Sequence, residues 1–332
     1  MASIDFIDPI ELTEFARIAR DEFDAQSQSL ASVFPYRAVN DIRFAFDRGV
    51  DAIADAAAFR SFDAESQIAR RPAMSRVTGE LQPISRKIPL SEYAQLRIRN
   101  ASNSEIADGV YGDAARLARE IQARIELGRG EILQTGDLAL DENGVISTYE
   151  SGRDPSLTVT TPPTDPWDNH DDADPIADLI SWAATVEGVS GVRPNRVIVS
   201  PSVMVDLQAN DSVKSSVGST IPAYATQGAV GEAVAGIAGM TIDVVGTMYP
   251  LSTPAINEDY VVLWNDTVGA GETLYGTTVE STDPEYQGLG VQPGLVAGAW
   301  TEHDPATLWT HAVAIALPLL KNPDTTMAHA VK

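Results

Sequence analysis

The feature of this sequence that most constrains its fold is one long amphipathic helix, predicted over residues 113–135. Asp113 can act as its N-cap, and Gly136 stands where a C′ glycine would end it. Between them, apolar residues recur every four positions, at Leu117, Ile121 and Ile125. At ~1.5 Å per residue the helix is roughly 33 Å long. Gly128 and Gly130 are expected to weaken and bend its last third.

Two strands and a linker are predicted after this helix. Val145–Glu150 and Leu157–Thr161 have strand character, and the five residues Ser151–Pro155 would join them as a hairpin loop. The segment Pro162-Pro163-Thr-Asp-Pro166 is typical of a stiff linker. We therefore place a boundary between two structural regions there.

The pattern after the linker alternates helices with strands. Asp174 as N-cap and Pro175 at N1 predict a helix start, and a 3.6-residue apolar stripe follows. The remaining segments of this region are a strand at Arg196–Ser200, a helix from Pro201 to Asn210, a flexible Ala- and Gly-rich stretch at Gly228–Gly239, and strands at Met240–Val245 and Tyr260–Trp264. The region is predicted to be α/β or α+β.

Residues 1–48 are predicted to form an arm. A short amphipathic helix is expected from Pro9 to Phe23, with Ile10, Phe15, Ile18 and Ala19 on one side. One helix on a polar tether cannot bury its own apolar stripe. The arm is therefore expected to dock on another surface, and Phe15 and Ile18 are candidate contacts with a neighbouring subunit.

Residues 49–99 are predicted to form a long, strand-rich excursion, and they are the most basic stretch of the chain. Its basic side chains include Arg60, Arg70, Arg71, Arg76, Arg86 and Lys87. No aromatic residues are interleaved with them in a stacking pattern, which disfavours a nucleic-acid site. Charged contact with an acidic neighbouring subunit is the better interpretation of the five arginines.

Composition limits the classes of partner. The 332 residues are enough for one large domain or two ordinary ones, and 44% hydrophobic content supports a real core. The net charge of −24 is uneven: residues 1–153 carry 18 basic and 25 acidic side chains, whereas residues 154–332 carry 5 and 22. Such a carboxyl half should repel nucleic acid. Its acidity indicates either solubility or a surface that faces packed DNA without binding it.

The sequence predicts no catalytic, cofactor-binding or metal site. There is no cysteine, and the four histidines show no metal-ligand spacing. The acidic run Asp168–Asp174 lacks the Gly and Glu that a calcium loop requires. No nucleophile elbow, dinucleotide loop or phosphate-binding loop is present. The acidic first residues argue against a signal peptide, and the longest apolar run, Ala312–Leu320, is too short to span a bilayer.

The order of the predicted segments along the chain resembles that of a known protein family. Its parts are the long helix with Thr135-Gly-Asp-Leu beginning a hairpin, the helix after Pro166, the strand and helix at 196–207, the strand-like pieces at 239–245 and 260–265, and an ending in which Asp304-Pro305 leads to Ala312–Leu320 and Pro323-Asp324. Over roughly residues 30–332 this resembles the lambda-type phage major head protein, the major capsid protein E family.

The resemblance implies an α+β chain with the Hong Kong 97 phage capsid fold. On that basis residues 1–48 correspond to an N-terminal arm and residues 49–99 to an extended E-loop. Residues 100–165 with 266–321 correspond to a peripheral domain that carries the long spine helix. Residues 166–265 with 322–332 correspond to an axial domain. The arm and the loop would each find a core on neighbouring subunits.

The function implied is structural, not enzymatic: a major capsid protein of a tailed double-stranded DNA bacteriophage. Copies would form hexamers and pentamers of an icosahedral shell in the bacterial cytoplasm, with a scaffold protein, a portal and a decoration protein as expected partners. Self-cross-linking through Lys87 or Lys321-Asn322 is disfavoured, because no catalytic carboxylate can be placed. The alternatives are an encapsulin-like nanocompartment and an unrelated α/β enzyme or binding protein.

Overall fold

The long helix α3 (Asn103–Thr135) organises the molecule, which the computed structural model describes over residues 7–48, 75–97, 103–217, 224–283, 286 and 292–332. The helix begins ten residues before Asp113, because Val110 is buried and Ile106 extends the apolar stripe further toward the N-terminus. Gly136 follows with φ of 86°, and its N–H donates to Ile132 O at 2.9 Å. The predicted C′ glycine is therefore confirmed.

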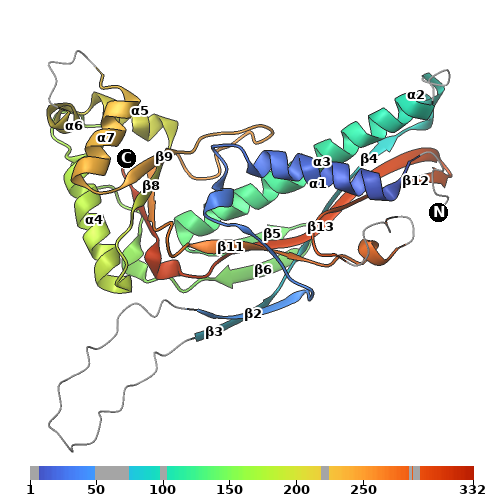
Figure 1. Ribbon diagram of the computed structural model, residues 1–332, viewed down its shortest axis with the longest axis horizontal. Helices are drawn as coiled ribbons and strands as arrows, with labels where there is room; N and C mark the ends of the chain where they lie inside the picture. The colour runs from blue at the N-terminus through green and yellow to red at the C-terminus, as the bar shows by residue number, and fades with distance from the viewer. Residues whose placement is uncertain (1–6, 49–74, 98–102, 218–223, 284–285, 287–291) are drawn as a thin grey trace, which may run out of the picture.

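The amino-terminal helix α1 (Pro9–Asp24) packs against α3 of its own chain (Figure 1). Its buried face consists of Leu12, Thr13, Ala16, Ala19 and Phe23. Of the predicted apolar side, Ala19 lies on this buried face, whereas Phe15 and Ile18 are 45% and 56% exposed. The expectation that this helix lacks a core within its own chain is wrong. Its alanines Ala16 and Ala19 belong to the same buried cluster as Ala114 and Ala118 of α3. These small side chains allow the two helices to approach closely.

A five-stranded sheet lies beside α3. Its central strand is β13 (Ala306–Leu320), which pairs antiparallel with β12 (Val296–His303), β11 (Gly271–Gly276) and β4 (Pro83–Leu90). The short β1 (Tyr36–Ala38) runs parallel to β11. The apolar run at 312–320 is thus the carboxyl-terminal part of β13. Its first residues are flanked by β4 on one side and by β12 or β11 on the other, residues 316–320 pair with β11, and α3 packs on the strand.

The hairpin after α3 differs from the predicted one. β5 (Asp137–Glu142) pairs with β6 (Val145–Glu150), and Asn143 and Gly144 form the turn with φ of 50° and 87°. An Asn-Gly pair with two positive φ angles suits a two-residue hairpin turn. Residues 157–161 therefore do not pair with β6. Instead β7 (Thr158–Val159) runs parallel to the carboxyl-terminal strand β14 (Met327–Ala330).

The second sheet has the order β7-β14-β10-β8-β9. β10 (Tyr260–Trp264) runs antiparallel to both β14 and β8 (Arg196–Val199), and β9 (Thr241–Val244) runs parallel to β8. Strands predicted at 196–200, 240–245 and 260–264 are confirmed. The chain order of this sheet shows that the terminal segment returns to lie beside β10.

Four helices pack with the second sheet: α4 (Pro175–Ser190), α5 (Pro201–Ala209), α6 (Asp211–Ser216) and α7 (Gln227–Ile237). Asp174 caps α4 by accepting from Ala177 N at 3.3 Å, as the sequence predicts. The stretch at 228–239 was expected to be flexible, and that prediction is wrong. Thr226 caps α7, and Val230 and Val234 are fully buried in the core of this region.

The remaining elements connect these parts. β2 (Arg43–Arg48) and β3 (Ser75–Glu80) form an antiparallel pair on either side of residues 49–74, which lie outside the described residues. More than half of the strand-rich excursion predicted at 49–99 therefore lies outside them too. A short helix α2 (Glu92–Arg97) precedes α3, and single 3₁₀ turns occupy Leu30–Ser32 (η1), Pro155–Leu157 (η2), Glu280–Thr282 (η3) and Pro323–Thr325 (η4).

Figure 1 shows an elongated lobe, made by α1, α3 and the sheet of β13, joined to a compact lobe, made by α4–α7 and the sheet of β10. The β2–β3 pair projects from the elongated lobe. One buried cluster crosses the junction, because it contains Ile132 of α3, Leu317 of β13, and Ile198, Val262 and Trp264 of the second sheet. The two lobes therefore share part of their core.

Candidate assembly surface

The residues predicted to make intersubunit contacts lie on separate elements. Arg60, Arg70 and Arg71 lie outside the described residues. Arg76 is on β3 and Arg86 on β4, while Phe15 and Ile18 are on α1. Of the described ones, Phe15 and Ile18 share one helix, and Arg86 lies on a strand of the sheet beside α3. Their intersubunit role stays a prediction.

The outward face of α1 carries an apolar patch. The ring of Phe15 meets Tyr111 of α3 edge to face, with centroids 5.6 Å apart. The Tyr111 hydroxyl donates to Glu11 Oε2 at 3.2 Å, which holds the aromatic pair in place. Ile18 lies one helical turn further along and is more exposed than Phe15. Phe15, Ile18 and Tyr111 form the surface that we call the α1 patch.

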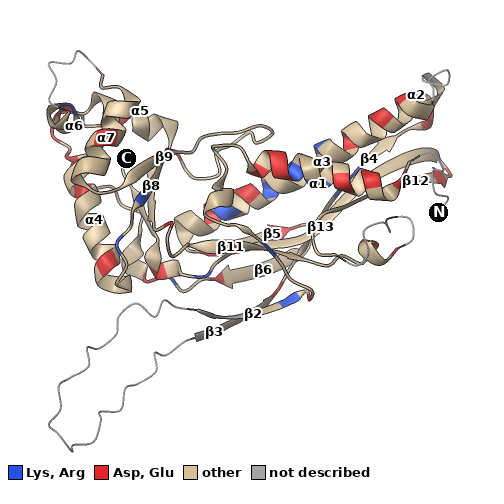
Figure 2. Ribbon diagram, in the orientation of Figure 1, with Lys and Arg blue, Asp and Glu red and all other residues tan. Residues whose placement is uncertain are grey.

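Arginines line a groove on the exposed surface of α3, where β4 and the loop before β10 approach the helix. Its volume is about 410 Å³. We call it the arginine groove, and its lining residues are Arg86, Arg116, Arg119, Glu120, Ala123, Tyr249 and Pro250. Figure 2 shows basic residues repeated along α3 in a chain that is acidic overall.

One carboxylate organises the arginine groove. Arg86 Nη1 donates to Glu120 Oε2 at 2.7 Å, and Arg116 Nε donates to Glu120 Oε1 at 3.1 Å. Arg119 Nη2 lies 3.7 Å from Glu22 Oε2 of α1. Because Glu120 is shared by two guanidinium groups, each retains N–H donors that can bind another acceptor. The sequence pattern indicated Arg86 but not Arg116 and Arg119, whose i,i+3 spacing on a helix was the available signal.

A buried charge network connects the end of α1 and the turn that follows it to α3. Arg129 is fully buried on α3, and its Nη1 donates to Asp24 Oδ1 at 2.7 Å and to Glu126 Oε2 at 2.9 Å. Glu126 Oε1 also accepts from Leu30 N at 2.6 Å. Burial raises the pKa of Glu126, while Arg129 opposes that shift. The network ties the segment that follows α1 to the middle of α3.

A helix also covers the exposed edge of β12. The Thr13 hydroxyl of α1 donates to Ala297 O at 3.0 Å and accepts from Ala297 N at 3.2 Å. Arg17 Nε donates to Leu295 O at 2.9 Å. An unpaired strand edge invites pairing with another chain, and here side chains of α1 bind the backbone groups at its start.

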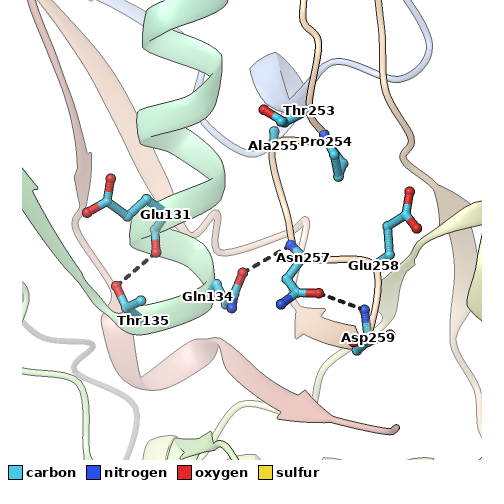
Figure 3. Close-up of a pocket in the computed structure, with 9 residues that line it drawn as sticks. All are labelled: Glu131, Gln134, Thr135, Thr253, Pro254, Ala255, Asn257, Glu258 and Asp259. Atoms are coloured by element: carbon cyan, nitrogen blue, oxygen red, sulfur yellow. Dashed lines mark hydrogen bonds between the residues drawn. The ribbon is translucent and has the colours of Figure 1, made fainter.

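A polar cleft of about 560 Å³ opens where the end of α3 meets the loop before β10 (Figure 3). Its hydrogen bonds hold the loop: Asn257 N donates to Gln134 Oε1 at 3.1 Å, and Asp259 N donates to Asn257 Oδ1 at 3.1 Å. The Glu131 and Glu258 carboxylates in Figure 3 point away from each other. These two carboxylates therefore do not face each other across the cleft.

His329 and Lys87 each pack on a tryptophan ring. His329 stacks on Trp182 with centroids 4.0 Å apart, and Trp182 stacks on the buried Trp167. Lys87 Nζ lies 4.1 Å from the ring centroid of Trp309. Within the described part of the chain, no group of three or more His, Asp or Glu side chains stands close enough to hold a metal ion. Nor does any described helix have the length and apolar character needed to cross a membrane.

The sequence and the fold of this chain were compared with those of known proteins. The family model of phage major capsid protein E matches residues 48–331. The putative capsid protein of a prophage of E. coli CFT073 is 15% identical, with a TM-score of 0.64 over 96% of this chain and 99% of that one. A phage-related protein from Bordetella bronchiseptica RB50 is 13% identical, with a TM-score of 0.57 over 99% and 97% of the two chains.

A third solved structure has the same fold. The virus-like particle from Pyrococcus furiosus is 13% identical to this chain, with a TM-score of 0.51 over 98% of this chain and 100% of that one. No curated protein sequence matches the chain. At these identities the structural likeness demonstrates a common fold, the Hong Kong 97-like fold of phage capsid proteins.

Proposed function

The chain belongs to the phage major capsid protein E family, and from this membership we propose that its copies close into an icosahedral shell of hexamers and pentamers. The observation that carries the proposal is the family match over residues 48–331. The shell forms the phage head and encloses double-stranded DNA. Assembly takes place in the cytoplasm of the host bacterium.

The lobes support an assignment of parts within the subunit. Residues 1–48 act as the N-terminal arm and residues 49–99 as the E-loop, at whose base β2 and β3 pair. Residues 100–165 with 266–321 make the peripheral domain, with α3 as its spine helix. Residues 166–265 with 322–332 make the axial domain. In support, β14 of the last segment pairs with β10, and α3 packs on β13.

Contacts between subunits use the α1 patch and the basic stretch. Phe15 and Ile18 are large apolar side chains left exposed on a helix whose other face is buried. Exposed apolar groups in a patch favour association. Arg60, Arg70, Arg71, Arg76 and Arg86 then supply charged contacts with acidic neighbours in a chain of net charge −24.

The role proposed is mechanical, without catalysis. In support, the family is a structural one, and the polar groups of the cleft in Figure 3 hold a loop against α3. Residues 154–332, which are acidic overall, suit a surface that faces packed DNA without sequence-specific binding. A separate scaffold protein, a portal and a decoration protein are the further partners proposed.

The contents of the particles test the DNA-enclosing function against the nanocompartment alternative. We expect particles made together with the genomic neighbours of this chain to protect double-stranded DNA from nuclease. The control is the same chain produced alone, whose particles should contain no phage-length DNA. Particles that hold a protein cargo and no DNA under both conditions would favour the nanocompartment.

A further inference from the structure

The arginine groove has donors that the subunit itself does not use. We propose that it binds the acidic segment 165–174 of a second copy of this chain, an inference that rests on the proposed shell function. The groove lies on the elongated lobe, between α3, β4 and the loop before β10. The segment precedes α4 and belongs to the compact lobe. A contact between them joins unlike parts of two subunits.

Charge is the first argument for this occupant. The groove has three guanidinium groups and one lining carboxylate, that of Glu120. The side chains of Arg86 and Arg116 are 64% and 67% exposed, so they remain open to a partner although both touch Glu120. Arginine binds carboxylates through paired N–H donors, which favours an acidic peptide over an apolar one.

The acidic segment offers the matching charges. Residues 165–174 contain no Lys or Arg and five exposed carboxylates, from Asp165, Asp168, Asp171, Asp172 and Asp174. In the described part of the chain, none of these five makes an ion pair within 4.0 Å. A contact with a basic groove relieves their mutual repulsion.

Packing and hydrogen bonds anchor one residue of each surface in the core, which lowers the entropy cost of ordering the backbone on binding. In the segment, the fully buried Trp167 donates its backbone N–H to Val331 O at 2.9 Å and its indole N–H to Asp178 Oδ2 at 2.9 Å. In the groove, Met248 packs with Phe23 and Ala123, which fixes the neighbouring Tyr249 at the rim with 78% of its surface exposed. Side chains ordered before binding lose less freedom on association.

Charge exchange tests this contact. We expect R116E/R119E to reduce the yield of shells about tenfold or more, since like charges then face each other across the contact. D168R/D171R should reduce the yield in the same way. Combining all four changes should restore shells, because the opposite charges face each other again. Shell yield is measured by sedimentation and electron microscopy, and subunit folding by circular dichroism.

A matched control distinguishes this contact from a general effect of charge on assembly. R193E reverses the charge of one arginine, which pairs with Glu187 away from the groove, and it should leave shell yield unchanged. R116E alone is compared with it, and this variant should reduce the yield. Normal shells from R116E/R119E, failure of the fourfold variant to recover, or an equal loss in R193E would each overturn the contact. Intact shells that lose only DNA would assign the groove to phosphate binding and overturn it too. If the unaltered chain forms no shells, the proposed function itself fails.

Discussion

At the scale of single residues, Gly130 of α3 leaves too little room for a side chain. A Cβ built there would lie 1.8 Å from the backbone oxygen of Ala255, in the loop before β10. The sequence shows Gly130 only as a helix-weakening residue. Its contact with a residue more than a hundred positions away depends on how the lobes meet, so the pattern could not predict it.

Gly130→Ala should lower the free energy of unfolding of the unassembled subunit by about 1–3 kcal/mol or more, because backbone must move to admit the methyl group. Gly112→Ala on the same helix is the control. No atom lies within 4 Å of a Cβ placed at Gly112, so that change should raise stability by about 0.5–1 kcal/mol. Urea unfolding measures both. Equal effects of the two variants would contradict the role of close packing at Gly130.

His329 makes the stability of the subunit depend on pH. Burial lowers its pKa below the ordinary 6.5, although the Ala330 carbonyl and Asp178 oppose the shift. The folded state therefore stays neutral while the unfolded state takes up a proton as the pH falls through about 6.5. Stability contributed by this residue is present above that pH and is lost below it.

The His329→Gln variant should show a smaller fall in unfolding free energy between neutral pH and about pH 5 than the unaltered chain. His303→Gln, at an exposed position, should leave the fall unchanged. Urea unfolding at the two pH values measures the difference. An identical pH dependence in the His329→Gln variant and the unaltered chain would show that the buried ring does not contribute.

At the scale of elements, α1 shows where pattern analysis succeeds and where it fails. The start of the helix follows from Asp8 and Pro9, and Asp8 does accept from Ile10 N at 2.8 Å. Its inward face could not be predicted from hydrophobicity, because the larger Phe15 and Ile18 point outward. Two residues favour the observed inward face. Ala16 is small enough to pack close to α3, and the Thr13 hydroxyl donates to the Ala297 carbonyl of β12.

The network of Arg129, Glu126 and Asp24 should hold α1 and the following turn onto α3. Arg129→Met leaves two carboxylates near each other in a buried place, so we expect a loss of about 3–5 kcal/mol in unfolding free energy. Arg193→Met, which breaks the exposed pair with Glu187, should cost at most about 1 kcal/mol. Similar losses in both variants would mean that burial of the network adds nothing.

The α1 patch should act in assembly and not in folding. Phe15→Ser with Ile18→Ser should change unfolding free energy by no more than about 0.5 kcal/mol per site, as expected at the surface. Shell yield should fall. Leu12→Ala, on the buried face of the same helix, should instead cost about 2–5 kcal/mol. Unchanged shell yield in the double Ser variant would remove this patch from the assembly surface.

At the scale of the whole molecule, the order of segments predicted the fold better than any single motif. The long helix, the strand at 196–199 and the helix after Pro201 all occur where the resemblance requires them. One pairing error is local: β6 pairs with β5 through the Asn143-Gly144 turn, a signal that the sequence does contain. The other is long-range, since β7 pairs with β14 near the end of the chain, and short windows of sequence do not contain such a register. The arginine groove was missed for the same reason, since it joins β4, α3 and a distant loop.

The central claim is that this chain builds a closed shell. Electron microscopy of the purified chain, produced with and without its genomic neighbours, tests it most directly. The account predicts closed particles or rings of subunits, whose diameter then limits the number of copies. A discrete monomer or dimer in both preparations would contradict it.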